Sequence, residues 1–569
     1  MPRRAVCLLL AALFLLLSCA KESLPAPVQT AETAEAGESA ESGKDRPARG
    51  DGVGAGKEKA PAPESGTGTA RFADRAEIDA VSEGRENSPD SFTLRFGGVP
   101  LPRAEERFWL PVTADFGLEN LTGLSAEDGE GGEASVLLDA ALPDADFARM
   151  MRESVPARIA VFTESAHASF ELVFTTLPVL SVRMDQEKRR TVGTTPMPAA
   201  FEVWEAAESG VRYTASRAEV SVRGASSASL SKTGFRLTLL DEKGEKKNLP
   251  LLGMRRDDDW ILYASYSDNT HVRDMVGWRL WERMTASSDA LNAAPMGAEY
   301  AELILGNRYY GLYVLMERVD AKMLSLDAGR GDSLFKCVSW DVPGSAGLAR
   351  QKPDSAAYSS MEKKYPDSST EPSAQDGTGN PWDNLAEYVR LCYEADGKEF
   401  AAHIGEVADL HNMLEYWLFL NVAMAADNTW KNTYYASVDG KMTAYPWDLD
   451  ITFGLGWNGE RANNYLYENS GAITASYDFQ CGRRLLKYVP GASDYVKERW
   501  EKIMSGHIAD ADTLIADARE FWDLLHSSGA WARNLERWPQ TSTADSLSYF
   551  ENAVQRRVKY LDKTIRALP

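Results

Sequence analysis

Four side chains in two short segments have the residue types and the spacing that magnesium-dependent phosphoryl transfer uses. Asp427 and Asn432 are five residues apart and directly follow a predicted helix. Asp448 and Asp450 belong to a second segment, which reads W-D-L-D-I-T-F-G. In the catalytic loops of phosphoryl-transfer enzymes an Asp accepts the proton of the attacking hydroxyl, and an Asn at this spacing helps to hold Mg²⁺. Mg²⁺ takes oxygen ligands, usually one or two carboxylates together with phosphates. The two segments therefore predict a phosphoryl-transfer site with a metal ion.

The elements around these segments are expected to bring them together. Asp409 is the predicted N-cap of a helix that precedes the first segment, because apolar residues recur after it at helical spacing. A β pair is predicted over residues 433–437 and 442–446, between the two segments. The residues also allow another interpretation, in which Asp448 and Asp450 cap a turn and bind no metal.

The rest of the chain predicts a β-rich half followed by a helical half. A small β domain is expected over residues 91–175, and a longer β-rich stretch begins at 176. One helix is predicted to interrupt it at 270–284, and a loop rich in Ser, Pro, Asp and Gly is predicted at 341–383. The tail over 493–568 is largely helical in pattern. This order predicts an α+β fold in which a cleft can form between the two halves.

The chain resembles the CotH kinase family, the spore-coat-protein-H-like atypical kinases, from about Leu177 to its C-terminus. Two positions differ from the family pattern: Ser231 precedes Lys232 where the family shows two adjacent lysines, and Asp274 stands where an Asn is frequent. The resemblance is carried by four ordered blocks, namely Arg223-Gly224-Ala225-Ser226-Ser227 with Lys232 and Phe235-Arg236-Leu237, then Asp258-Asp259-Trp260-Ile261-Leu262 with Asp268-Asn269-Thr270 and Arg273, then Gly306 to Glu317, and finally Asp427 to Asn432 with Asp448 to Gly454.

The resemblance implies a bilobal, protein-kinase-like domain over residues 176–569 that uses Mg-ATP to phosphorylate Ser or Thr in proteins. It makes Asp427 the catalytic aspartate and places Lys431 near the γ-phosphate. It makes Asn432, Asp448 and Asp450 the implied metal ligands, with Asp448 the main one. The residues implied at the nucleotide are Lys232, Arg223, Gly224, Ser226 and Ser227 at the phosphates and Met316 and Glu317 at an adenine-contacting hinge.

The first residues have the pattern of an export signal. Arg3 and Arg4 precede an apolar run that is too short to span a bilayer, and the run ends in L-L-S-C at Cys19. This ending resembles a bacterial lipobox, so residues 1–19 are expected to be a lipoprotein signal peptide and Cys19 the lipidated first residue. A plain secretory signal is the alternative. In either case the mature chain is expected outside the cytoplasm, and with the lipid it is anchored to a bacterial membrane, in the periplasm or at the cell surface.

A flexible linker is expected to follow the signal, over residues 20–90. No Leu, Ile, Met or aromatic residue lies between Gln29 and Ala70, so this part cannot bury enough apolar area to offset the entropy of ordering it. Beyond the first apolar run, no stretch of about 18 apolar residues occurs, which excludes a protein with several membrane spans. Cys337, Cys392 and Cys481 have no metal-ligand spacing and are expected to be buried, inert thiols.

The charge of the 569-residue chain restricts its partners. It carries 62 Lys and Arg against 84 Asp and Glu, a formal net charge of −22, which argues against nucleic acid as a partner and suggests a basic protein acceptor. With the Ser or Thr acceptor that the resemblance implies, the expected substrate is a basic, Ser/Thr-rich protein. Because ATP is scarce outside the cytoplasm, a second hypothesis is a catalytically weak or inactive kinase-fold protein that binds partners or has a structural role. A third is phosphoryl transfer to a non-protein acceptor such as a glycan.

Overall fold

The computed structural model describes residues 70–184, 192–208, 210–224, 226–290, 294–367, 379–456, 479–539 and 546–569. The predicted signal peptide, Cys19 and the predicted linker up to residue 69 lie outside the described residues.

A ten-stranded sheet forms from residues 71–175. Its apolar side chains, among them Phe92, Leu110 and Val161, are buried in a core of their own. Residues 70–90 were expected in the linker, but β1 pairs in parallel with β8, so the ordered chain begins earlier than the sequence indicates. The strands are β1 (Arg71–Ala73), β2 (Glu86–Asn87), β3 (Phe92–Phe96), β4 (Val99–Pro100), β5 (Arg103–Ala104), β6 (Arg107–Pro111), β7 (Leu124–Asp128), β8 (Glu133–Asp139), β9 (Ala157–Phe162) and β10 (Ala166–Thr175), with α2 (Arg75–Ala80) and α3 (Phe147–Arg152) beside them.

A closed barrel follows, in the strand order β11-β12-β13-β14-β17-β19-β18. Its neighbours are antiparallel except at the closing seam, where β11 runs parallel to β18. Alternate residues point inward, as in β14, where Phe235, Leu237 and Leu239 are buried. The strands are β11 (Val179–Met184), β12 (Met197–Ala207), β13 (Gly210–Arg223), β14 (Gly234–Leu240), β17 (Asp259–Tyr263), β18 (Ala298–Leu305) and β19 (Arg308–Glu317); β15 (Leu249–Pro250) and β16 (Arg256–Asp257) form a separate pair.

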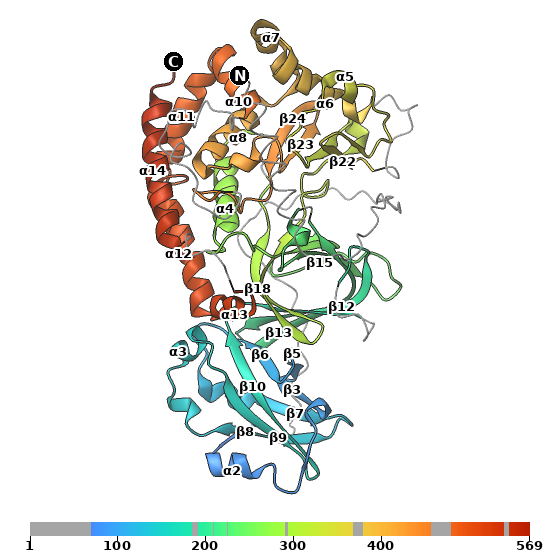
Figure 1. Ribbon diagram of the computed structural model, residues 1–569, viewed down its shortest axis with the longest axis vertical. Helices are drawn as coiled ribbons and strands as arrows, with labels where there is room; N and C mark the ends of the chain where they lie inside the picture. Colours follow the sequence, from blue (N-terminus) through green and yellow to red (C-terminus); the bar gives the residue numbers. More distant parts are fainter. Residues whose placement is uncertain are drawn as a thin grey trace, which may run out of the picture. The chain divides into compact units, whose positions relative to one another are not determined.

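The third part combines a five-stranded sheet with helices around one apolar core (Figure 1). The sheet has the order β21-β22-β20-β23-β24, and the buried helix α8 packs against β24. Its strands are β20 (Ser333–Cys337), β21 (Ala357–Tyr358), β22 (Met361–Tyr365), β23 (Thr433–Val438) and β24 (Lys441–Pro446). The helices are α4 (Arg273–Ala286), α5 (Ser345–Leu348), α6 (Pro381–Val389), α7 (Gly397–Val407), α8 (Leu410–Ala423), α10 (Gln480–Tyr488), α11 (Ala492–Ser505), α12 (Ala511–Ser527), α13 (Ala530–Arg537) and α14 (Leu547–Arg566).

The predicted α+β class is confirmed, with two differences in detail. The helix predicted at 270–284 begins at Arg273, because the residues before it form a turn around Asp268. The loop predicted at 341–383 contains α5, β21 and β22, whose short segments lack a clear period. Cys337, Cys392 and Cys481 are buried and unpaired, as expected. None of the helices in the described part of the chain is long and apolar enough to cross a membrane.

Candidate functional site

The loop that carries Asp427 follows the most buried helix of the structure's third part. Asp409 caps α8 as predicted, since its carboxylate accepts hydrogen bonds from the N–H groups of His411 and Asn412. The helix ends at Ala423, and the C-cap residue Met424 has φ of 53°. A left-handed conformation is uncommon for a bulky side chain and is found most often where the surroundings impose it.

Asn428 links the two predicted segments through hydrogen bonds. Its side-chain nitrogen donates to the carbonyl oxygens of Asn432 (3.0 Å) and Trp447 (2.5 Å), and the N–H of Trp447 donates to the carbonyl of Asn432 (3.0 Å). Asn432 and Asp448 both have positive φ, 57° and 60°. The two segments therefore meet at the ends of β23 and β24, in a backbone arrangement that the surrounding bonds hold.

Asp427 is hydrogen bonded to two of the side chains that the sequence places with it. The side-chain nitrogen of Asn432 donates to Oδ2 of Asp427 (2.7 Å), and the ammonium of Lys431 donates to the same oxygen (3.1 Å). Burial raises the pKa of Asp427 above its usual value, although Lys431 acts in the opposite direction. The structure thus brings Asp427, Lys431 and Asn432 into one hydrogen-bonded group.

Asp448 and Asp450 form an acidic cluster with a third carboxyl group, Asp274. The phenol of Tyr263 donates to Oδ1 of Asp448 (3.3 Å), and the N–H of Leu449 donates to Oδ1 of Asp274 (2.8 Å). Burial raises the pKa of Asp274 and of Asp450 well above the usual value, and the charge of Asp448 raises both further. Asp448 also acts on the pKa of Asp427, so the acidic cluster and the Asp427 loop are electrostatic neighbours.

A divalent cation fits this donor set. Oδ2 of Asp274 is buried and has no hydrogen-bond partner, and the carboxylates around it repel one another. The side-chain nitrogen of Asn432 donates to Asp427, which leaves the side-chain oxygen Oδ1 of Asn432 available as a metal ligand. Among the described residues no three His, Cys, Asp or Glu side chains are grouped to hold a metal by themselves. Mg²⁺ usually binds one or two carboxylates together with substrate phosphates.

The acidic segment is supported by a buried ion pair at the start of α4. Arg273 and Asp268 are both fully buried, and Nη1 of Arg273 donates to Oδ1 of Asp268 (2.6 Å). The Nε of Arg273 also donates to the carbonyl of Thr452 (3.0 Å), within the segment that begins with Asp448. Arg273 therefore has a structural role: through its ion pair and this hydrogen bond it holds the segment that begins with Asp448 in place.

Lys232 is not brought to the cluster. Its side chain is buried, and the ammonium donates to the carbonyls of Ala264 (2.9 Å) and Leu312 and to Oδ1 of Asn534 (3.0 Å). Burial lowers its pKa well below the usual range. An ammonium with three internal acceptors has no donor left for a phosphate, so the structure does not support the predicted phosphate contact of Lys232.

The other residues predicted at the phosphates lie in the loop that follows β13, apart from Arg223, which ends that strand. Gly224 has φ of 119° and a substituent there would lie 2.3 Å from Oγ of Ser227, so this turn after Arg223 requires glycine. Ser226 begins a short 3₁₀ turn in the same loop. Arg223, Gly224, Ser226, Ser227 and Lys232 thus follow one another along the chain, and Arg223 is placed near Asp448 by an electrostatic contact.

Met316 and Glu317 are the last two residues of β19. Met316 is fully buried, and the carboxylate of Glu317 accepts from the N–H groups of Arg255 (2.9 Å) and Gly297 (3.3 Å). Glu317 also lines a cavity of about 830 Å³ next to α4, together with Trp278. Their side chains are therefore engaged within the protein, and the hinge assignment stays a prediction.

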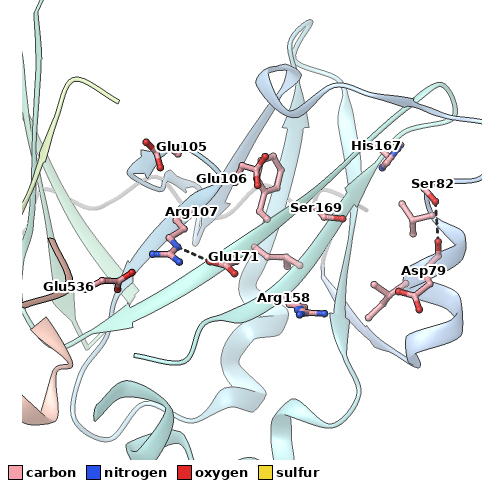
Figure 2. A pocket seen from close by; sticks show the side chains of 14 residues that line it. Asp79, Ser82, Glu105, Glu106, Arg107, Arg158, His167, Ser169, Glu171 and Glu536 are labelled. Atoms are coloured by element: carbon pink, nitrogen blue, oxygen red, sulfur yellow. Dashed lines mark hydrogen bonds and ion pairs between the residues drawn. The ribbon is translucent and has the colours of Figure 1, made fainter. Parts of the chain in front are cut away.

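A second cavity, of about 1030 Å³, lies on the first sheet and contains none of the predicted site residues. Its floor carries an ion pair between Arg107 and Glu171 (2.7 Å), which Figure 2 shows together with Arg158 and Ser169. The wall on one side includes Glu536 of α13. Nothing in the sequence pattern pointed to this cavity, because its residues come from separate strands.

Tyr263, Asp274 and Lys336 are the candidate functional residues that the sequence did not assign. Asp274 is visible in the sequence only as a departure from a family pattern, and Tyr263 only as a strand residue. Lys336 lies in β20 opposite Tyr434 of β23, and its ammonium is 5.7 Å from the ring centre of Trp447. No motif marks a single lysine within an apolar strand, so only the fold reveals its position.

The comparison with known protein families gives a match over the part of the chain that forms this site. The family model described as CotH kinase protein matches residues 220–566, which include both segments of the site and the barrel strands from β14 onward. No curated protein matches the chain.

Proposed function

This chain belongs to the CotH kinase family, and on that premise we propose that it transfers a phosphoryl group from Mg-ATP to Ser or Thr of a protein. The observation that carries the proposal is the group formed by Asp427, Lys431 and Asn432 beside the carboxylates of Asp448 and Asp450. We further propose that the barrel is the N-lobe, and the five-stranded sheet with its helices the C-lobe, of a bilobal kinase-like domain.

In this proposal Asp427 accepts the proton of the acceptor hydroxyl. Its raised pKa makes the carboxylate a better proton acceptor than an exposed one, and Asn432 fixes the orientation of Oδ2. The ammonium of Lys431 contacts the same oxygen, and it can stabilise the negative charge that develops on the transferred group. When bound by Asn432, Asp448 and Asp450, Mg²⁺ supplies positive charge to the phosphates.

The acceptor and the location follow from charge and from the first residues. The net charge of −22 favours encounter with a basic protein, so we propose a Lys/Arg-rich acceptor with Ser or Thr residues. We also propose that the protein is exported and anchored through a lipid on Cys19, which places the reaction outside the cytoplasm.

Phosphoryl transfer with labelled ATP tests the proposal. The full chain is incubated with Mg²⁺ and γ-labelled ATP, and label is followed into the chain itself and into a basic, Ser-rich protein. Asp427→Asn and Asp448→Asn are each expected to reduce transfer by about 10²–10⁴-fold, because each removes a group used in the transition state. Asp439→Asn is the matched control, since Asp439 lies in the β23–β24 turn and 66% of its side chain is exposed.

The same experiment separates the proposal from the alternative of a binding or structural protein. Transfer by the native chain that the control retains and the two variants lose supports the kinase. If the native chain binds no nucleotide at millimolar concentration with Mg²⁺ present, the kinase proposal is refuted and a kinase-fold binding protein is the better description. Transfer that is unchanged in Asp427→Asn refutes the role of Asp427.

A further inference from the structure

A short loop with exposed apolar side chains starts next to the hydrogen-bonded group of the candidate site. β20 ends at Cys337, and the carbonyl of Cys337 accepts a hydrogen bond from the N–H of Asn432 (3.2 Å). Shortly after the strand the chain exposes Trp340, of which 47% is accessible, and Val342, of which 36% is accessible. Residues 338–344, which we call the 340 loop, therefore continue directly from a strand that is bonded to the candidate site.

Hydrogen bonds hold both ends of the 340 loop. At its start the N–H of Val338 donates to the carbonyl of Ser360 (2.8 Å), and Oγ of the same serine accepts from the indole of Trp430 (3.2 Å) in the Asp427 loop. Just after its end, the N–H of Ser345 (2.8 Å) and its hydroxyl (2.6 Å) donate to Glu394. Because the loop is held at both ends, a ligand that covers its exposed side chains orders little additional chain.

The 340 loop also carries an exposed negative charge. Asp341 lies between the two apolar residues and has no ion-paired partner among the residues that the structure describes. At the start of the loop, burial raises the pKa of Cys337 to about 12, and the nearby ammonium of Lys431 is one of the groups that oppose this shift. The loop thus presents an apolar, an acidic and a second apolar side chain in succession, close to Lys431 of the candidate site.

The length of chain between the loop and the site limits how far apart they are. Trp340 is three residues beyond Cys337, and an extended chain spans about 3.3–3.6 Å per residue, so their Cα atoms are at most ~11 Å apart. Asn432, which is bonded to Cys337, also contacts Asp427, the proposed proton acceptor. An extended acceptor segment with its hydroxyl at Asp427 can therefore reach the indole of Trp340 with a side chain within about six residues of the Ser or Thr.

We propose that Trp340 and Val342 dock an apolar side chain of the protein acceptor and that Asp341 contacts a basic residue beside it. This inference rests on the proposed function, because it adds a recognition element for the same acceptor. Tryptophan is among the residues that most often dominate binding at protein interfaces, and a partly exposed indole gains apolar burial when a partner covers it. An acceptor that combines apolar and basic residues also fits the net charge of −22.

Peptide binding by the full chain, without nucleotide, tests the docking surface. Labelled basic peptides carry one Ser and a Leu-Arg pair about four residues from it, before the Ser in one peptide and after it in the other. Matched peptides carry Ala for the Leu or Gln for the Arg. In anisotropy titrations the native chain should bind the Leu peptide about tenfold more tightly than the Ala peptide in one of the two orientations. Trp340→Ala should remove this difference, and Trp340→Phe should retain most of it.

Leu524→Ala is the matched control, because Leu524 lies on α12 and has the same exposed fraction as Val342, 36%. This variant should bind both peptides as the native chain does. Asp341→Asn should reduce the preference for Arg over Gln, and added salt should reduce that preference in the native chain. Where transfer is measured, Trp340→Ala should raise the KM for the Leu peptide and leave kcat unchanged, since the docking contact is the same before and during the reaction.

Equal affinity of the native chain for the Leu and Ala peptides overturns the inference, and so does a difference that persists in Trp340→Ala. Self-association of the native chain that Trp340→Ala abolishes in sedimentation also overturns it, because the loop then contacts a second copy. If the peptides bind through Trp340 but ATP gives no transfer, the docking surface stands and the kinase proposal fails. Transfer to these peptides that does not depend on Trp340 leaves the kinase proposal standing and overturns the docking surface.

Discussion

The buried pair between Asp268 and Arg273 permits a quantitative test of how the acidic segment is positioned. Both side chains are fully buried, and Asp268 accepts four hydrogen bonds. Two come from Thr270 (2.9 and 2.6 Å) and two from Arg273 (2.9 and 2.6 Å). Burial raises the pKa of Asp268, but the charge of Arg273 and the bond from Thr270 outweigh it, so the carboxylate stays ionised in the fold.

The perturbations are Asp268→Asn, Arg273→Met and the double variant. Breaking a buried ion pair leaves one uncompensated charge and typically costs about 3–5 kcal/mol. Each single variant is therefore expected to lose that amount of unfolding free energy. The double variant removes both charges and should lose about 2–3 kcal/mol less than the sum of the two single losses, because the interaction is counted only once.

Urea unfolding followed by circular dichroism measures these differences, and the midpoint is compared only between variants with the same slope. Because the Nε of Arg273 holds the carbonyl of Thr452, Arg273→Met should also weaken Mg-nucleotide binding, whereas Asp268→Asn should do so less. Single losses below about 1 kcal/mol, or a double loss equal to the sum, would refute a cooperative buried pair at the base of the acidic segment.

Three further predictions concern single residues. Burial and the charge of Arg223 lower the pKa of Lys336 to about 8, so the native chain should gain up to ~3 kcal/mol of stability as the pH rises from 8 to about 10.5. Lys336→Met should lack that part of the gain when urea midpoints are compared across pH. Burial lowers the pKa of His271 to about 4, so stability should fall by up to ~3 kcal/mol as pH decreases from about 6.5 to 4, and a thermal unfolding series should show a smaller fall for His271→Gln. Gly454→Ala should cost at least ~1 kcal/mol in a thermal melt, since Gly454 has φ of 89° and the new methyl would lie 2.8 Å from Cβ of Ala553; an unchanged melting temperature contradicts this.

Local sequence signals predicted those elements whose contacts are local. Apolar residues at helical spacing predicted the helix after Asp409, and the capping role of Asp409 is confirmed. The β pair before Asp448 also forms at the expected place. The three residues of β1 gave no signal, because such a short strand is stabilised by pairing with Leu137–Asp139, far along the chain.

The same distinction applies to the candidate site. Asp427 and Asn432 could be placed together from sequence because five residues of one loop separate them. Lys232 is close in sequence to the phosphate-loop block, but its side chain is buried, and its ammonium donates to the carbonyl of Leu312 in β19 and to Oδ1 of Asn534 in α13. Lys336 reaches Trp447 only because β20 and β23 pair, which no local pattern reports.

The closing seam of the barrel has a consequence for the order in which the chain folds. The strands of the first sheet all come from residues 71–175, so this sheet can form as soon as that stretch has left the ribosome. Val179 of β11, in contrast, pairs with Glu302 of β18, and closure must wait until the intervening residues have been synthesised. Long-range pairing of this kind is slow, because the loop must close before its contacts form. We therefore expect hydrogen exchange pulsed during refolding to protect the amides of β9 and β10 before those of β11.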